Sequence, residues 1–372
     1  MGGRMSTVLR LAGVAVALCA ALGVAACGSS RSAGSDDDVT KVSFLYAGPM
    51  HDDGYNQGYF ETGEAIKKRL GDKVEVTNAD NVPYTDQVGK VASQLVATGT
   101  DVIVDTGGYG EALDDVCRRQ RAVTCLIPLP QGELTDNMVG FYQEWWKQEY
   151  VLGAAAGLMT RADVVGAVNP LTIPLTNSYM NSFLLGCQAT NPDCKMRTVT
   201  INSYYDPSAS TQAANTLANA GADVLTGWVN DSTPCQVAQK RGLRAVGQYY
   251  DYARACPEAM IGTAVWGGDP EYDQWFVDQV AAVHDGRFEG GDVHVIRFGD
   301  GANLSRWGNS VPQDVRKKAD QIARDLESGK LDPFKGPMTD NQGKQRVPAG
   351  EQLTEDFLVS GWDWRLNGMI GG

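Results

Sequence analysis

The residues best suited to acid–base chemistry are two adjacent acids, Asp52 and Asp53, which follow a predicted strand. Two carboxylates can act as general acid and general base, but adjacent acids between a strand and a helix are more often a helix cap. The sequence has no Gly-x-x-x-x-Gly-Lys-Ser/Thr, Gly-x-Ser-x-Gly or His-Glu-x-x-His motif, and no Gly-x-Gly-x-x-Gly follows a predicted strand. The histidines, His51, His284 and His294, lack the spacing of metal ligands. The sequence therefore predicts a protein without catalytic residues, cofactor or metal.

A flat ring beside a polar group recurs instead, just after one predicted strand and then another. Because ligands bind outside the carboxyl ends of strands in open parallel sheets, these loops are expected to face one another across a cleft. Rings offer stacking faces, while carboxylates and amides orient a ligand; packing between helices or lobes is the alternative role. The candidate ligand-binding residues are Asp53, Tyr55, Asn56, Gly107, Gly108, Tyr109, Tyr205, Trp228, Asn230, Tyr249, Asp251 and Trp266.

The elements that must position these residues alternate along the chain. The predicted strands are 41–47, 74–80, 101–106, 124–129, 138–142, 164–168, 198–202, 223–229, 244–248 and 260–266, and the predicted helices are 57–70, 86–98, 144–160, 175–189, 208–220, 234–241 and 312–329. Parallel neighbours need long crossovers, so this alternation predicts an α/β fold of parallel βαβ units. The pattern starts again after residue 162, which indicates two similar lobes and a hinged cleft. We expect one lobe at 41–162 plus about 263–292, and the other at 163–262 plus about 293–372.

The composition is that of a folded, acidic protein. Of the residues, 43% are hydrophobic and 21% are charged, which is typical of globular chains. The length of 372 residues is enough for about two domains. Lys and Arg number 32 against 45 Asp and Glu, giving a net charge of -13. Such a charge repels phosphate backbones, so we expect no nucleic-acid partner.

The N-terminus has the order of an export signal. Arg4 and Arg10 precede an apolar run that ends at Ala26 and is too short for a mature transmembrane helix. Small residues directly before Cys27 resemble a bacterial lipobox, which implies cleavage after residue 26 and lipid on Cys27. The alternative is an ordinary signal followed by an incidental cysteine. Residues 27–40, rich in Gly, Ser and Asp, are expected to form a flexible tether.

Six further cysteines lie beyond Cys19 and Cys27. An even number in an exported protein suggests disulfides, and short closures favour three local pairs. The predicted pairs are Cys117 with Cys125, Cys187 with Cys194, and Cys235 with Cys256. A metal site and free buried thiols are the alternatives, although the sequence has no Cys-x-x-Cys motif.

A series of segments in fixed order carries a family resemblance from about residue 41 to 358. They are 44–49 (Phe-Leu-Tyr-Ala-Gly-Pro), 53–56 (Asp-Gly-Tyr-Asn), 149–157, 202–207 (Asn-Ser-Tyr-Tyr-Asp-Pro), 220–224 (Ala-Gly-Ala-Asp-Val), 263–266 (Thr-Ala-Val-Trp), 334–337 and 340–344. Together they resemble the extracytoplasmic solute-binding proteins of the basic membrane protein type, which include purine nucleoside receptors of ABC transporters. The resemblance implies a type I periplasmic-binding-protein fold, with two Rossmann-like α/β lobes joined by several hinge strands.

The resemblance also implies a ligand. It places the stacking aromatic on Tyr55, with Asp53 and Asn56 as its hydrogen-bonding neighbours. Two positions depart from the family pattern: Tyr249 stands where relatives often have an acid, and Trp266 stands near a lysine position of the nucleoside-binding members. The possible ligands therefore include a free base or another flat heterocycle as well as a nucleoside.

The chain is accordingly expected to be a lipid-anchored, non-enzymatic binding protein on the outer face of a bacterial cytoplasmic membrane. It would capture a purine-like solute and deliver it to the permease and ATPase subunits of an ABC importer. The alternatives are a ligand-sensing receptor that is not coupled to transport, and an extracytoplasmic nucleoside-processing enzyme.

Overall fold

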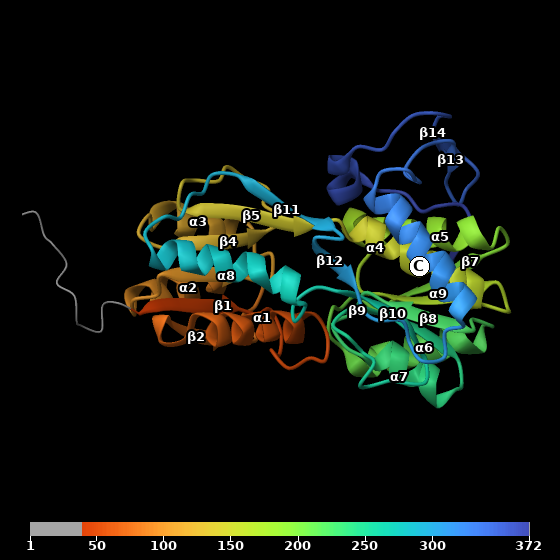
Figure 1. Ribbon diagram of the computed structural model, residues 1–372, viewed down its shortest axis with the longest axis horizontal. Coiled ribbons are helices and arrows are strands. Elements are labelled where there is room, and N and C mark those ends of the chain that lie inside the picture. The colour runs from red at the N-terminus through yellow and green to blue at the C-terminus, as the bar shows by residue number, and fades with distance from the viewer. Residues whose placement is uncertain (1–38, 372) are drawn as a thin grey trace, which may run out of the picture. The chain divides into compact units, whose positions relative to one another are not determined.

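The computed structural model describes residues 39–371, which form two groups of strands with helices on both faces (Figure 1). In the first group, here the first lobe, parallel strands lie in the order β2-β1-β3-β4-β5-β11. In the second lobe the order is β15-β7-β6-β8-β9-β10-β12, parallel except for β12, which runs antiparallel to β10. Pairing of β11 with β12 joins the two groups into one 13-stranded sheet.

The first lobe contains β1 (Thr40–Leu45), α1 (Tyr55–Leu70), β2 (Val74–Ala79), α2 (Gln87–Ala97), β3 (Val102–Asp105), α3 (Glu111–Arg119), β4 (Thr124–Pro128), β5 (Met138–Gln143), α8 (Pro270–His284) and β11 (Val293–Phe298). The second lobe contains α4 (Trp145–Met159), β6 (Val164–Asn169), α5 (Pro174–Thr190), β7 (Lys195–Thr200), α6 (Pro207–Asn219), β8 (Val224–Gly227), α7 (Thr233–Lys240), β9 (Arg244–Tyr249), β10 (Met260–Val265), β12 (Gly301–Leu304), α9 (Gln313–Glu327) and β15 (Met369–Gly371). A short hairpin, β13 (Met338–Thr339) with β14 (Gln345–Val347), lies in the C-terminal segment.

The predicted α/β fold with parallel sheets is confirmed, and each predicted strand and helix has a counterpart within a few residues. Two helices, α3 and α8, have no counterpart among the predicted segments. Helix α8 carries Tyr272, Trp275, Phe276 and Val277, and such aromatic and β-branched residues favour strands in a sequence pattern. The predicted signal peptide and Cys27 lie outside the described residues. Within 39–371, no helix is long and apolar enough to cross a membrane.

The chain crosses from one lobe to the other at different positions from those predicted from the sequence. Helix α4, expected in the first lobe, packs against α5, α9 and β10 of the second. The reason is close helix packing: a Cβ on Gly153 of α4 would collide with the carbonyl of Phe183, and one on Gly186 of α5 with that of Tyr150. Strand β11, expected in the second lobe, pairs with β5 of the first. The crossovers therefore fall between β5 and α4, between β10 and α8, and between β11 and β12.

Helices α6 and α8 each begin with an aspartate cap followed by proline. Asp269 accepts hydrogen bonds from the amides of Glu271 (2.9 Å) and Tyr272 (3.2 Å) at the start of α8, and Asp206 accepts one from Ala209 (2.9 Å) in α6. In both helices proline occupies the first turn, where its missing N–H is not needed. These caps therefore fix where α6 and α8 begin after the preceding loops.

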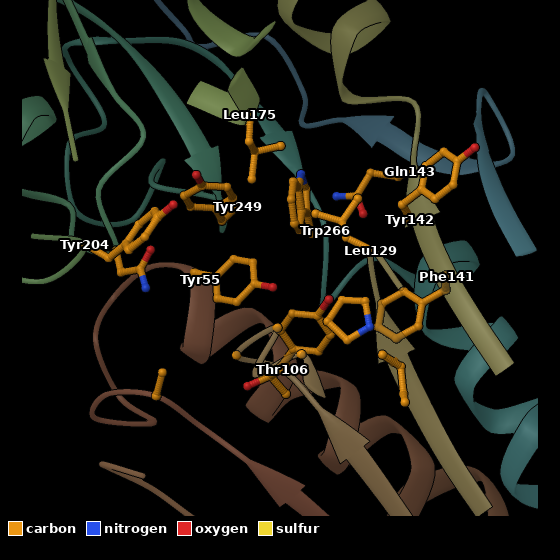
Figure 2. Close-up of a pocket in the computed structure, with 18 of the residues that line it drawn as sticks. Tyr55, Thr106, Leu129, Phe141, Tyr142, Gln143, Leu175, Tyr204, Tyr249 and Trp266 are labelled. Carbon is orange, nitrogen blue, oxygen red and sulfur yellow. The ribbon is translucent and has the colours of Figure 1, made fainter. Parts of the chain in front are cut away.

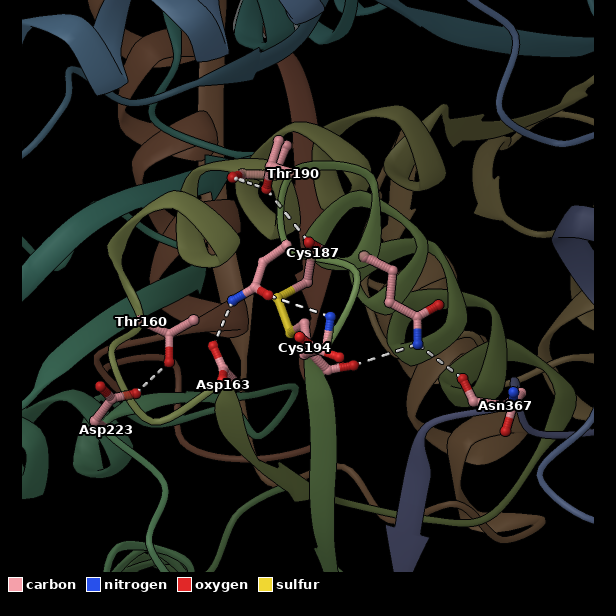
Figure 3. The surroundings of a disulfide bond; sticks show 11 residues. Thr160, Asp163, Cys187, Thr190, Cys194, Asp223 and Asn367 are labelled. Carbon is pink, nitrogen blue, oxygen red and sulfur yellow. Dashed lines mark hydrogen bonds between the residues drawn. A yellow bond between two sulfur atoms is a disulfide. The ribbon is translucent and has the colours of Figure 1, made fainter.

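The three predicted disulfides are present. Cys117–Cys125 joins α3 to β4, Cys187–Cys194 joins α5 to the segment before β7, and Cys235–Cys256 joins α7 to the segment before β10, with Cα–Cα distances of 6.1, 6.0 and 6.0 Å. Hydrogen bonds surround the Cys187–Cys194 bridge, including Asn191 to Asp163 at 2.8 Å (Figure 3). Each bridge thus fixes a helix to its own lobe.

Candidate functional site

A cavity of about 470 Å³ lies between the two lobes, at the carboxyl ends of their parallel strands. Its first-lobe wall comes from the start of α1, from α3, and from residues that end or follow β1 to β5. Its second-lobe wall comes from residues that end or follow β6 to β10 and from helix α5. This is the edge where open parallel sheets bind ligands, as the strand-end loops predicted.

Three aromatic rings from three different elements meet in this cavity (Figure 2). Tyr55 begins α1, Tyr249 ends β9, and Trp266 directly follows β10. The ring centroids are 5.2 Å apart for Tyr55 and Tyr249, 5.4 Å for Tyr55 and Trp266, and 5.0 Å for Tyr249 and Trp266, with interplanar angles of 86°, 69° and 84°. Such edge-to-face contacts are favourable for aromatic pairs. We call these three residues the aromatic triad.

The triad rests on rings and backbone groups behind it. Tyr55 packs edge-on against Tyr59 at 5.1 Å, and the Tyr59 hydroxyl accepts a hydrogen bond from Tyr272 at 3.0 Å. The hydroxyl of Tyr249 donates to the carbonyl of Trp228 at 3.2 Å. Tyr249 also has a positive φ of 70°, a backbone conformation rare for a bulky residue. Strain of this kind persists where the surroundings hold a residue at a functional position.

Burial keeps the phenols of the cavity neutral. It raises the pKa of Tyr55, Tyr249 and Tyr179 well above the ordinary value, because the charged form is poorly solvated there. At neutral pH these side chains therefore keep their protons and present uncharged rings and hydroxyl groups. Among the described residues, no group of three or more His, Cys, Asp or Glu side chains is placed to hold a metal ion.

Two polar groups of the first-lobe wall have no hydrogen-bond partner among residues 39–371. Gln143, at the end of β5, is 2% exposed, and its amide nitrogen makes no hydrogen bond. Asp114, in α3, is 3% exposed, and its carboxylate oxygen Oδ1 makes none. Both residues line the cavity. Buried polar atoms are nearly always paired, so these two call for a functional explanation.

The backbone amides between β3 and α3 are, in contrast, already bonded. Asp105 accepts hydrogen bonds from the amides of Gly107 and Gly108 at 2.8 Å each and from that of Tyr109 at 3.1 Å. Burial raises the pKa of Asp105 to about 7, although these amides act in the opposite direction. The start of α3 is therefore closed by the protein's own carboxyl group.

Most of the candidate residues line the cavity as expected from the sequence. They are Tyr55, Asn56, Gly107, Gly108, Asn230, Tyr249 and Trp266. Tyr55 and Trp266, which lie far apart in the chain, come together as the strand-end argument predicted. The Asn56 amide donates to the carbonyl of Pro49 at 3.1 Å, which fixes the side chain beside the triad.

The other candidates lie outside the cavity lining: Asp53, Tyr109, Tyr205, Trp228 and Asp251. Tyr109 lies behind Tyr84, its hydroxyl bonded to the carbonyl of Val82 at 3.0 Å. Trp228 is fully buried and stacks on Tyr179 with 5° between the planes. Tyr205 and Asp251 are exposed, and Asp251 bonds to the amide of Ala253 in its own turn.

Of the two adjacent acids, the buried one caps a helix. Asp52 accepts hydrogen bonds from the amides of Gly54 (2.9 Å), Asn56 (3.1 Å) and Gln57 (3.0 Å) at the start of α1. Burial raises its pKa to about 7, against the effect of these amides. Asp53 is exposed and adopts a positive φ of 57°. The helix-cap interpretation is therefore confirmed for Asp52, whose capping orients Tyr55 and Asn56.

Several cavity residues were not among the candidates. Gln143 is the last residue of β5, so the expectation that ligands bind at strand ends covers it as well. The aromatic residues directly before it belong to the strand pattern, which gave no separate signal for Gln143. Tyr179 and Asp114 lie inside helices, where an aromatic or an acid is indistinguishable from ordinary core or surface residues by pattern. Tyr84 lies in the loop after β2 and bonds to the carbonyl of Gly107 at 2.8 Å.

A buried carboxyl group supports the second-lobe wall from behind. Glu149, in α4, is 1% exposed and accepts hydrogen bonds from the indole of Trp228 at 3.0 Å and the amide of Gln248 at 3.1 Å. Burial raises the pKa of Glu149 to about 8, and the two bonds only partly oppose this. Because Trp228 stacks on Tyr179, Glu149 acts on the cavity wall indirectly.

The lobes touch closely beside the triad. Gly54, at the start of α1, faces the loop after β8, and a Cβ there would lie 2.7 Å from the carbonyl carbon of Asn230 and 3.0 Å from the nitrogen of Asp231. Only glycine permits this approach. The triad is therefore flanked by a backbone contact between the first and the second lobe.

Comparison with known proteins places these features in a family. Residues 39–302 match the model of the Bmp family, described as ABC transporter substrate-binding protein PnrA-like. A purine-binding protein of Brucella abortus is 28% identical over 340 residues, covering 89% of this chain and 95% of its own. Among solved structures, an ABC transporter solute-binding protein from Conexibacter woesei matches with a TM-score of 0.64 and 22% identity, over 79% of this chain and 98% of its own. One from Aeropyrum pernix matches with a TM-score of 0.66 and 18% identity, over 79% and 92%.

Proposed function

We propose that this chain, which belongs to the PnrA-like family of ABC transporter substrate-binding proteins, captures a purine base or nucleoside in the cavity between its lobes and delivers it to an importer. The observation that carries the proposal is the aromatic triad. Purines are flat and aromatic, and rings such as Tyr55 and Trp266 offer stacking faces for them. A cavity of about 470 Å³ falls within the usual range for small-molecule sites.

The origin of the three rings supports capture by closure. Tyr55 belongs to the first lobe, whereas Tyr249 and Trp266 belong to the second. A ligand that touches all three contacts both lobes and therefore favours the closed arrangement over an open one. Hinge closure around a ligand is the known behaviour of periplasmic binding proteins.

The ligand class is supported by similarity as well as by shape. The relative from Brucella abortus is named as a purine-binding protein and aligns over nearly the whole of both chains. Tyr249 and Trp266, the two positions where this sequence departs from the family pattern, are both in the triad. Their rings favour a flat heterocycle at that point of the cavity.

Export and lipid anchoring belong to the same proposal. Cys27, the proposed lipidation site, lies outside the described residues and follows an apolar signal. The three disulfides of the folded part are typical of an oxidising compartment outside the cytoplasm. We place the protein on the outer face of the cytoplasmic membrane, beside the permease and ATPase subunits of its importer.

The test is titration calorimetry of the parent with adenine, hypoxanthine, guanine and their nucleosides. Base–aromatic stacking contributes about 1–3 kcal/mol per base, so Tyr55→Ala should weaken binding by about 5- to 150-fold. Tyr205→Ala is the matched control, because Tyr205 is exposed and outside the cavity lining. A parent that binds none of these compounds would refute the purine proposal, and equal losses in both variants would refute the role of the triad.

A further inference from the structure

The cavity lining holds one acidic side chain and no basic one among the described residues. Among the described residues that line it, none is Lys, Arg or His, and the single carboxylate is Asp114. The tyrosines remain neutral because burial raises their pKa values. An anionic group of a ligand would therefore find no cation to pair with inside the cavity.

The protein's own charges leave one oxygen of Asp114 free. The side chain is 3% exposed, and its Oδ1 atom has no hydrogen-bond partner in the part of the chain that the structure describes. Arg118, one turn further along α3, directs its guanidinium to Glu111 at 2.6 Å and to Asp115 at 3.0 Å instead. Burying an acceptor without a donor is unfavourable by itself, so Asp114 is poised for a donor that comes from outside the chain.

A complementary donor lies on the same wall. The Gln143 side chain extends among the rings of the cavity (Figure 2). It is 2% exposed, and its amide nitrogen has no acceptor. The first lobe thus presents one unpaired acceptor and one unpaired donor, while the second lobe presents Tyr249 and Trp266.

The glycine-containing turn between β3 and α3 is not free to bind a phosphate. Helix N-termini and glycine-rich turns bind anions through free backbone amides. Here the amides of Gly107, Gly108 and Tyr109 already donate to Asp105. Among residues 39–371, the cavity lining therefore offers a phosphate no side-chain cation, and the amides of this turn are already bonded.

We propose that Asp114 is a specificity-determining residue of this site: it accepts a hydrogen bond from an N–H or O–H group of the ligand, with Gln143 donating to a ligand acceptor. The inference rests on the proposed purine-binding function and narrows it. The ligand is an uncharged base or nucleoside with a donor directed at the first lobe, and nucleotides are rejected. The donor is either an N–H of the base or a hydroxyl of the ribose.

Calorimetry with adenine, adenosine and adenosine monophosphate tests this inference in the parent and three variants. Asp114→Ala removes the acceptor and should weaken binding by about 10- to 150-fold, since hydrogen bonds to charged groups are among the stronger ones. Asp114→Asn should recover part of that loss. Asp115→Ala is the matched control on the same helix, outside the cavity lining and in an exposed ion pair, and should bind like the parent.

Two further measurements separate this role from a structural one. The melting temperature of ligand-free Asp114→Ala should not fall, because no hydrogen bond within the protein is lost at Oδ1. Loss for adenine and adenosine alike identifies an N–H of the base as the donor, and loss for adenosine alone identifies a ribose hydroxyl.

Each contrary result has a distinct meaning. If Asp114→Ala binds both compounds as the parent does, or if the monophosphate binds the parent as tightly as adenosine, the inference is overturned and the purine function stands. A parent that binds none of the three overturns both.

Discussion

Closure of the two lobes predicts that a single methyl group at Gly54 weakens ligand binding without weakening the fold. In Gly54→Ala the new Cβ would lie 2.7 Å from the carbonyl carbon of Asn230, well inside van der Waals contact. The obstacle is backbone, which cannot rotate away as a side chain would. The lobes must therefore separate slightly or deform the loop after β8.

The expected size follows from the cost of overpacking. Forcing an extra methyl into a packed site costs about 1–3 kcal/mol. If this cost falls on the closed arrangement alone, the apparent affinity falls by about 5- to 150-fold, because ligand binding must then restore a less populated state. The ligand-free protein can avoid the contact by opening, so its melting temperature should change little.

Calorimetry with the best purine ligand measures the affinity, and small-angle scattering with and without ligand measures closure. Gly58→Ala is the matched control on the same helix, since its Cβ would meet Gly267 at 3.4 Å, an ordinary contact. Alanine also favours a helix interior over glycine, so this control should bind as the parent does. Affinity of Gly54→Ala within twofold of the parent, or no change in radius on saturation of the parent, would refute the closure argument.

Two other predictions concern a buried acid and the N-terminus. Burial raises the pKa of Glu149 from its ordinary value of 4.5 to about 8, so the folded protein retains a proton that the unfolded chain releases; stability should fall as pH rises across that interval. Glu149→Gln should flatten this slope by up to about 1.4 kcal/mol per pH unit in urea unfolding between pH 5 and 8, and identical slopes would contradict it. Cys27→Ser should move the protein from the membrane to the soluble fraction of cells with no change in its far-UV circular dichroism; unchanged partitioning would exclude the lipid anchor.

The alternation of short β-branched runs with amphipathic segments was enough to predict the parallel α/β fold. The allocation of segments to lobes was not predictable in this way. Helix α4 follows the last strand of its run in the first lobe, yet it joins the second lobe because Gly153 and Gly186 let it pack closely against α5. Such a choice depends on shape between elements distant in sequence, which local periodicity does not record.

The candidate site shows the same division. Strand-end position correctly brought Tyr55, Tyr249 and Trp266 into one cavity. Strand-end position did not show which of two adjacent residues faces the cavity: Tyr204 lines it, whereas Tyr205 is exposed. Adjacent residues in a loop point in different directions, and composition does not say which one turns inward.

In the proposed site, recognition is divided between the lobes in a way that links specificity to closure. The unpaired acceptor of Asp114 and donor of Gln143 belong to the first lobe, whereas Tyr249 and Trp266 belong to the second. A flat molecule without donors can stack on the rings but leaves the Asp114 acceptor of the first lobe unpaired. Because a ligand shifts an equilibrium only by its differential affinity for the two states, such a molecule favours closure less than a purine with a matching N–H or O–H group. We therefore expect ligands with and without such a group to differ more in how far they close the lobes than in how well they stack on the aromatic rings.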